Sequence, residues 1–86
     1  MRTSHALILR LWHDPAFNIN KTAVEYVDRG APEDRSTVYG EYIINLDRHY
    51  FEIISGEKTK AIPYHRIRRI TYIGITIWKK PINPAE

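Results

Sequence analysis

The sequence contains no cysteine, which excludes disulfides, thiolate catalysis and zinc sites built on cysteine. Its four glycines are isolated from one another, so it has no glycine-rich loop to hold a phosphate. The longest apolar run, residues 6–9, is far shorter than the roughly 20 residues that span a bilayer, and no signal peptide is visible. We therefore expect a soluble, cytoplasmic protein with no membrane partner.

What is present is an ordinary globular composition, with 43% hydrophobic and 27% charged residues in a chain of 86. That length suits one domain with one modest core. Thirteen Lys and Arg residues against ten Asp and Glu residues give a net charge of +3, but the charge is spread unevenly. Residues 66–80 carry five cations and no acid, an imbalance that favours a polyanionic partner.

A short amphipathic helix is predicted over residues 4–13. Its apolar residues fall on one helical face, as the spacing of Leu7 and Leu11 illustrates. Thr3 or Ser4 can cap its start. Pro15 ends the helix, because the residue before a proline avoids the α-helical region.

The rest of the chain alternates in the manner of strands. We expect strands or hairpins over residues 21–28, 49–54, 58–62 and 70–78. Residues 41–46 fit a short helix or a strand equally well. Because helices and strands do not alternate, the fold class is predicted as α+β, with one N-terminal helix packed on a mainly antiparallel sheet of four to six strands. Residues 1–80 would form this single domain, and residues 81–86 a flexible C-terminal tail.

The densest chemistry lies in residues 62–70, where three isoleucines are interspersed with a tyrosine, a histidine and three arginines. Pro63 ends the preceding strand, so residues 63–66 should form a single helical or 3₁₀ turn. If the isoleucines are buried, the guanidinium groups must stay at the surface, because burying an unpaired charge is too unfavourable. Arginine and histidine clustered in this way suit an anion with directional oxygens. The candidate phosphate or nucleic-acid contacts are Arg29, Tyr64, His65, Arg66, Arg68, Lys79 and Lys80.

Two of these candidates depend on other patterns. Arg29 precedes Gly30 in a predicted loop over residues 29–34, where the backbone can hold a charged side chain close to a ligand. Tyr64 is the best candidate for a free ring, since most of the six tyrosines should pack in the core and one or two should remain exposed. An exposed ring beside arginines can stack an unpaired base. The alternative for the whole cluster is a solvated basic surface without a ligand.

The order of the elements resembles a known family. The chain runs from a short helix ending at Trp12, through Arg-Gly-Ala-Pro at 29–32 and Ile-Pro-Tyr-His-Arg-Ile at 62–67, to a hairpin at Gly74. Over residues 5–80 it resembles the archaeal RNA cyclic group end recognition domain family, also known as the predicted RNA-binding domain of archaeal poly(A) polymerase. The resemblance implies recognition of RNA ends that carry a 2′,3′-cyclic or related phosphate. The matching positions are Arg29, Tyr64, His65 and Arg66.

We therefore predict a non-catalytic domain that binds the phosphate-bearing 3′ end of single-stranded RNA, with RNA-processing proteins as a further class of partner. Arg29 and Arg66 would contact phosphate oxygens, and His65 would donate to the phosphate or the 2′-oxygen. Tyr64 would stack on the last base or ribose. The upstream backbone would be held by Arg68, Lys79 and Lys80.

Two alternatives stay open. A cyclic-phosphate hydrolase would use His65 as general acid or base and would need a second proton-transfer group, for which the candidates are His49, Tyr50 and Asp28. A protein-interaction module would instead pair through exposed strand edges, with a partner or a second copy. Neither a metal nor another cofactor is expected, because the four histidines are scattered and lack ligand spacing.

Overall fold

The computed structural model describes residues 3–80, and its α-helix, α1 (Ser4–His13), has the predicted bounds. Thr3 lies at the N-cap, where its side-chain oxygen accepts a hydrogen bond of 3.0 Å from the backbone N–H of Ala6. The helix ends at Asp14, whose N–H donates to the carbonyl of Arg10. None of the helices within residues 3–80 is long and apolar enough to cross a lipid bilayer.

Seven strands form two antiparallel sheets, which confirms the α+β class. The four-stranded sheet has the order β2 (Arg35–Tyr39), β1 (Thr22–Val27), β6 (Ile67–Tyr72) and β7 (Ile75–Lys79). The three-stranded sheet has the order β3 (Ile43–Leu46), β4 (Tyr50–Ser55) and β5 (Lys58–Pro63). Four 3₁₀ turns connect these elements: η1 (Ile19–Lys21), η2 (Pro32–Asp34), η3 (Gly40–Tyr42) and η4 (Tyr64–Arg66).

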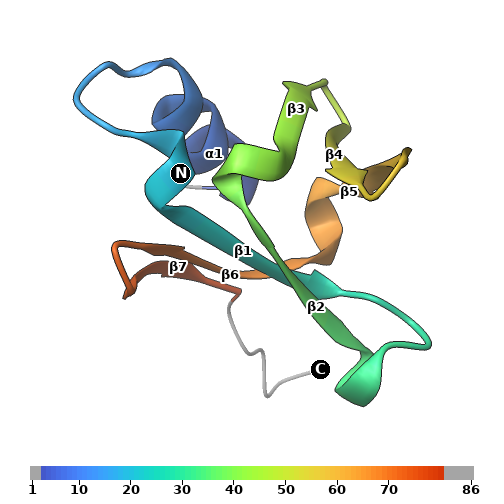
Figure 1. Ribbon diagram of the computed structural model, residues 1–86. Coiled ribbons are helices and arrows are strands. Elements are labelled where there is room, and N and C mark those ends of the chain that lie inside the picture. The colour runs from blue at the N-terminus through green and yellow to red at the C-terminus, as the bar shows by residue number, and fades with distance from the viewer. Residues whose placement is uncertain (1–2, 81–86) are drawn as a thin grey trace.

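Helix α1 and the three-stranded sheet lie on the same side of the four-stranded sheet (Figure 1). The core fills the space between them, so the four-stranded sheet has a buried inner face and an outer face that no helix or strand of residues 3–80 covers. The largest fully buried apolar side chains are Phe51, Ile8, Leu11, Ile62, Ile67, Ile70 and Val24.

The architecture differs from the prediction in three respects. Within residues 3–80 the strands number seven rather than four to six, in part because β2 occupies residues that showed no strand signal. These strands are divided between two sheets rather than joined in one. Residues 41–46, which fitted a helix or a strand, contain the end of η3 and then β3. The last hairpin begins earlier than predicted, at Ile67. The predicted tail, residues 81–86, lies outside the described residues.

A β-bulge explains the early start of β6. Glu25 pairs with Arg69 and Tyr26 pairs with Ile67, so Arg68 is an extra residue without a partner on β1. This extra residue lets Ile67 and Ile70 both point into the core although they are three positions apart. In a regular strand, two residues three positions apart would point to opposite faces.

Gly40, the first residue of η3, is buried against η1. A Cβ atom at this position would overlap the backbone carbonyl of Ile19. Only glycine therefore allows these two 3₁₀ turns to approach so closely.

Candidate functional site

In the basic segment of residues 62–70, the isoleucines are buried and the charged side chains are exposed, as predicted. Ile62, Ile67 and Ile70 are at most 2% exposed, whereas the side chains of His65 and Arg66 lie at the surface. Residues 64–66 form a 3₁₀ turn, as expected, with Pro63 at its N-cap. The hydrophobic anchors thus present the polar residues of the turn to solvent.

Tyr64 does not have the free ring that the sequence predicted; that prediction is wrong. It is 7% exposed, and its ring stacks on His5 of α1 with 4.1 Å between the ring centroids. Its hydroxyl donates to the carbonyl of Asp47 at 2.7 Å, and burial raises its pKa to about 12. Ser4 adds a third tie, since its hydroxyl donates to the Tyr64 carbonyl at 3.3 Å. Tyr64 therefore attaches α1 to the turn and has no free ring face for a base.

The outer face of the four-stranded sheet gathers six cations, which we call the basic face: Arg29, Arg35, Arg68, Arg69, Lys79 and Lys80. They line two adjoining open hollows, of about 510 and 230 Å³. Arg35 and Arg68 border both hollows and so join them into one surface. Four of these six cations were predicted site residues. Arg35 was missed because β2 was not foreseen, and Arg69 was expected at the surface but not assigned a role.

Three acidic residues also border the basic face: Glu33 and Asp34 line the larger hollow, and Glu25 lines the smaller one. Glu25, on β1, pairs with Arg35 of β2 at 3.4 Å and with Arg69 of β6 at 3.7 Å. Within residues 3–80, no carboxylate comes within ion-pair distance of Arg29, Arg68 or Lys79. These charges are available to a polyanion, while Glu25 holds its two arginines in place.

His65 and Arg66 lie beside the basic face rather than in its hollows. Among the described residues that line the two hollows, neither appears. His65 reaches the basic face through its backbone, because its carbonyl accepts a hydrogen bond of 2.9 Å from Nζ of Lys80. Arg66 lies near enough to Asp28 to help lower the pKa of that carboxyl, although the Ser36 hydroxyl is the main cause. The structure thus brings Arg29, Arg68, Lys79 and Lys80 together and sets His65 and Arg66 at their border.

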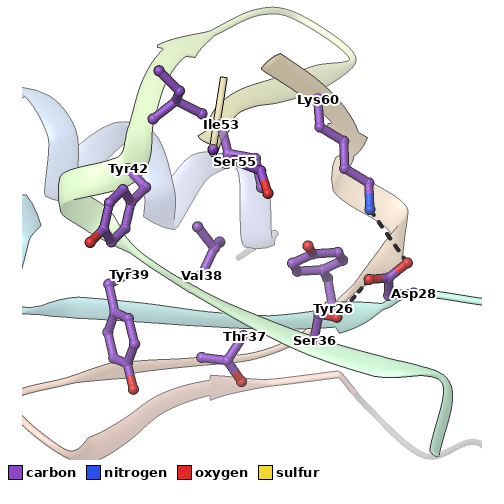
Figure 2. A pocket seen from close by; sticks show the side chains of 12 residues that line it. Tyr26, Asp28, Ser36, Thr37, Val38, Tyr39, Tyr42, Ile53, Ser55 and Lys60 are labelled. Atoms are coloured by element: carbon purple, nitrogen blue, oxygen red, sulfur yellow. Dashed lines mark hydrogen bonds and ion pairs between the residues drawn. The ribbon is translucent and has the colours of Figure 1, made fainter. Parts of the chain in front are cut away.

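A separate hollow, which we call the inter-sheet cleft, lies between β2 of the larger sheet and the β4–β5 hairpin of the smaller one (Figure 2). It measures about 500 Å³ and is lined by three tyrosines, Tyr26, Tyr39 and Tyr42. Tyr39 is 56% and Tyr42 45% exposed, so these two rings, and not Tyr64, are the free ones. The expectation of one or two free tyrosines was correct in number, but no pattern in the sequence distinguishes Tyr39 and Tyr42 from Tyr64.

The far end of the cleft is polar. Ser36 donates to Asp28 at 2.6 Å, and the ammonium of Lys60 lies 3.4 Å from the other carboxylate oxygen. The hydrogen bond from Ser36 and the charge of Lys60 lower the pKa of Asp28 below its ordinary value, so it is ionised near neutral pH. Lys60 also lies over the ring of Tyr26, 5.7 Å from its centroid.

Of the proposed partners of His65, none shares a side-chain hydrogen bond with it within residues 3–80. In the same part of the chain, no three His, Asp or Glu side chains gather as a metal site.

Comparison with known proteins gives one result. A sequence model of the MJ1316 RNA cyclic group end recognition domain matches residues 1–80. No curated protein and no solved structure matches the chain. Because the matched region is nearly the whole sequence, the chain belongs to the MJ1316 RNA cyclic group end recognition domain family.

Proposed function

We propose that the protein is a non-catalytic domain that binds single-stranded RNA at a phosphate-bearing 3′ end. The family name points to the recognition of RNA ends with a cyclic group, which agrees with RNA binding. The observation that carries the proposal is the basic face, on which cations from a loop and from both strands of a hairpin border two joined hollows.

The terminal phosphate would bind in the larger hollow. Arg29 and Arg68 line this hollow from two directions, and neither is paired with a carboxylate within residues 3–80. Arginine offers a planar fork that can donate two hydrogen bonds to phosphate oxygens. Arg66 and His65, at the border, would contact the same phosphate or the neighbouring ribose.

The upstream backbone would follow β7. Lys79 and Lys80 line the smaller hollow, next to Arg68. Lysine gives a compact charge that can follow a flexible backbone without selecting a base. The phosphates would therefore provide most of the affinity, and the end-specific contacts would be few.

The salt dependence of binding tests the proposal. With two or three phosphates neutralised, log Kd should change with log salt concentration with a slope of about 1.4 to 2, at roughly 0.7 per phosphate for single strands. Fluorescence anisotropy with one short RNA, ending in a 2′,3′-cyclic phosphate, a 3′-phosphate or a 3′-hydroxyl, provides the measurement. Equal affinity for the three ends, or binding that salt does not change, would contradict the proposal.

Matched variants locate the contact. Arg68→Ala should weaken binding by about 10- to 150-fold, since a charge-assisted hydrogen bond contributes about 1.5–3 kcal/mol. It should also reduce the salt slope by about 0.7. Lys58→Ala removes an equally exposed cation from β5, away from the basic face, and should leave the affinity nearly unchanged. Glu25→Gln should strengthen binding, because it removes the acid that pairs with Arg35 and Arg69.

A further inference from the structure

The inter-sheet cleft is large enough for a nucleoside. Its volume of about 500 Å³ lies within the roughly 300–1,000 Å³ of small-molecule sites. Strands β1 and β2 form one wall, and the β4–β5 hairpin forms the other. The cleft therefore depends on the two-sheet arrangement and not on any single loop.

One exposed ring borders its open end. Figure 2 shows Tyr42 on the cleft side of β2, whereas the ring of Tyr39 points to the other side of that strand. Tyr39 pairs with Ala23, so its side chain belongs to the outer face of the four-stranded sheet. Tyr42 is 45% exposed, and its ring contacts no other aromatic ring within residues 3–80. An aromatic face exposed in this way can stack an unpaired base whatever its identity.

The opposite end offers a fixed hydrogen-bond acceptor. Asp28 is held by Ser36 at 2.6 Å and by Lys60 at 3.4 Å, so its carboxylate cannot rotate freely. An ionised carboxylate accepts hydrogen bonds from ribose hydroxyls or from the N–H groups of a base. Figure 2 shows Tyr42 and this carboxylate at opposite ends of one space, with Tyr26 between them.

The cleft adjoins the surface proposed to bind phosphate. Thr37 of β2 borders the cleft and also a shallow hollow of the outer face, which Glu25 and Arg69 line as well. Arg35, on the same strand and in both hollows of the basic face, lies about 7 Å away at two residues along an extended chain. One edge strand therefore separates a cationic surface from an aromatic cleft.

We infer that the inter-sheet cleft receives the terminal nucleoside of the RNA, with its base against Tyr42 and its sugar or base donors on Asp28. This inference rests on the proposed function, because the phosphates on the basic face are what bring the nucleoside to β2. In this arrangement the cleft recognises the terminal base, while the basic face binds the charged phosphates.

The test compares two RNAs that differ only in the last base. Both are short, fluorescent and carry a 3′-phosphate, but one ends in an abasic ribose. The full 86-residue chain should bind the abasic RNA about 5- to 100-fold more weakly, the range expected for one stacked base. Tyr42→Ala should weaken binding of the intact RNA but not of the abasic RNA, and Tyr42→Phe should restore it.

The controls separate this inference from the proposed function. Ile44→Ala shortens a side chain of the smaller sheet that is 46% exposed and outside the cleft, and it should bind both RNAs like the unmodified protein. If both RNAs bind equally with the expected salt dependence, the cleft inference is overturned and the proposed function stands. If the RNAs differ but the tyrosine variants do not, the base is read elsewhere and the inference is again overturned. Absence of salt-dependent RNA binding overturns both.

Discussion

The two faces of the four-stranded sheet are built from alternate residues of the same strands and have opposite characters. In β1, Val24 and Tyr26 are buried, while Glu25 between them points outward to its two arginines. In β6, Ile67 and Ile70 are buried on either side of an exposed pair of arginines. The inner face therefore carries the stability and the outer face carries the charge, so substitutions should be able to change one without the other.

The largest effect should come from the inner face. Ile70→Ala should lower the free energy of unfolding by about 2–5 kcal/mol, because Ile70 is fully buried and its removal leaves a cavity. Its neighbour Arg69 is exposed and makes one ion pair of 3.7 Å, so Arg69→Ala should cost less than about 1 kcal/mol. Urea denaturation measures both. A comparable loss in the two variants would show that the outer face is also part of the core.

A smaller effect in the opposite direction should come from Thr22. This residue is fully buried, and its hydroxyl has no hydrogen-bond partner within residues 3–80. Thr22→Val keeps the shape and removes the unsatisfied group, so we expect stability to rise by about 1 kcal/mol. Ala23→Val, on the partly exposed outer position beside it, serves as the control and should change stability less. Destabilisation by Thr22→Val would mean that the hydroxyl does have a partner, such as an internal water.

The smallest effect concerns Asp28, where the two faces meet beyond the end of β1. Its pKa in the folded protein is lowered from 3.8, so its contribution to stability is fully present above that pH and is lost as pH falls through the folded value. Asp28→Asn should therefore be less stable than the unmodified protein at pH 7, by less than about 1 kcal/mol for a partly exposed pair, and the difference should shrink below about pH 4. Thermal unfolding of both proteins between pH 3 and 7 measures this. A difference in stability that does not depend on pH would show that the charge of Asp28 does not stabilise the fold.

The sequence was sufficient wherever the determinants are local. Helix α1 was predicted with its bounds because the cap at Thr3 and the proline after Asp14 both act on adjacent residues. The turn at 64–66 followed from Pro63 and the spacing of the isoleucines. The exposure of the arginines followed from the free energy needed to bury an unpaired charge.

Non-local features were beyond the reach of the sequence. Strand β2 has a single buried residue, Val38, so its apolar pattern is too weak to detect. The division into two sheets depends on pairings such as Thr22 with Tyr72, fifty residues apart. The exposed tyrosines could not be distinguished from the buried one because their exposure depends on a distant element. Helix α1 packs on Tyr64 and leaves Tyr39 and Tyr42 uncovered.

Gly40 lies between those two tyrosines in the chain, and its contact with Ile19 has a consequence for them. The segment that carries both rings is positioned by a backbone-to-backbone approach that any side chain at residue 40 would prevent. The positions of both rings therefore depend on the absence of a side chain at residue 40. A single alanine at this buried position, which alters no charge and no aromatic group, would shift the opening of the cleft that we propose to receive the base.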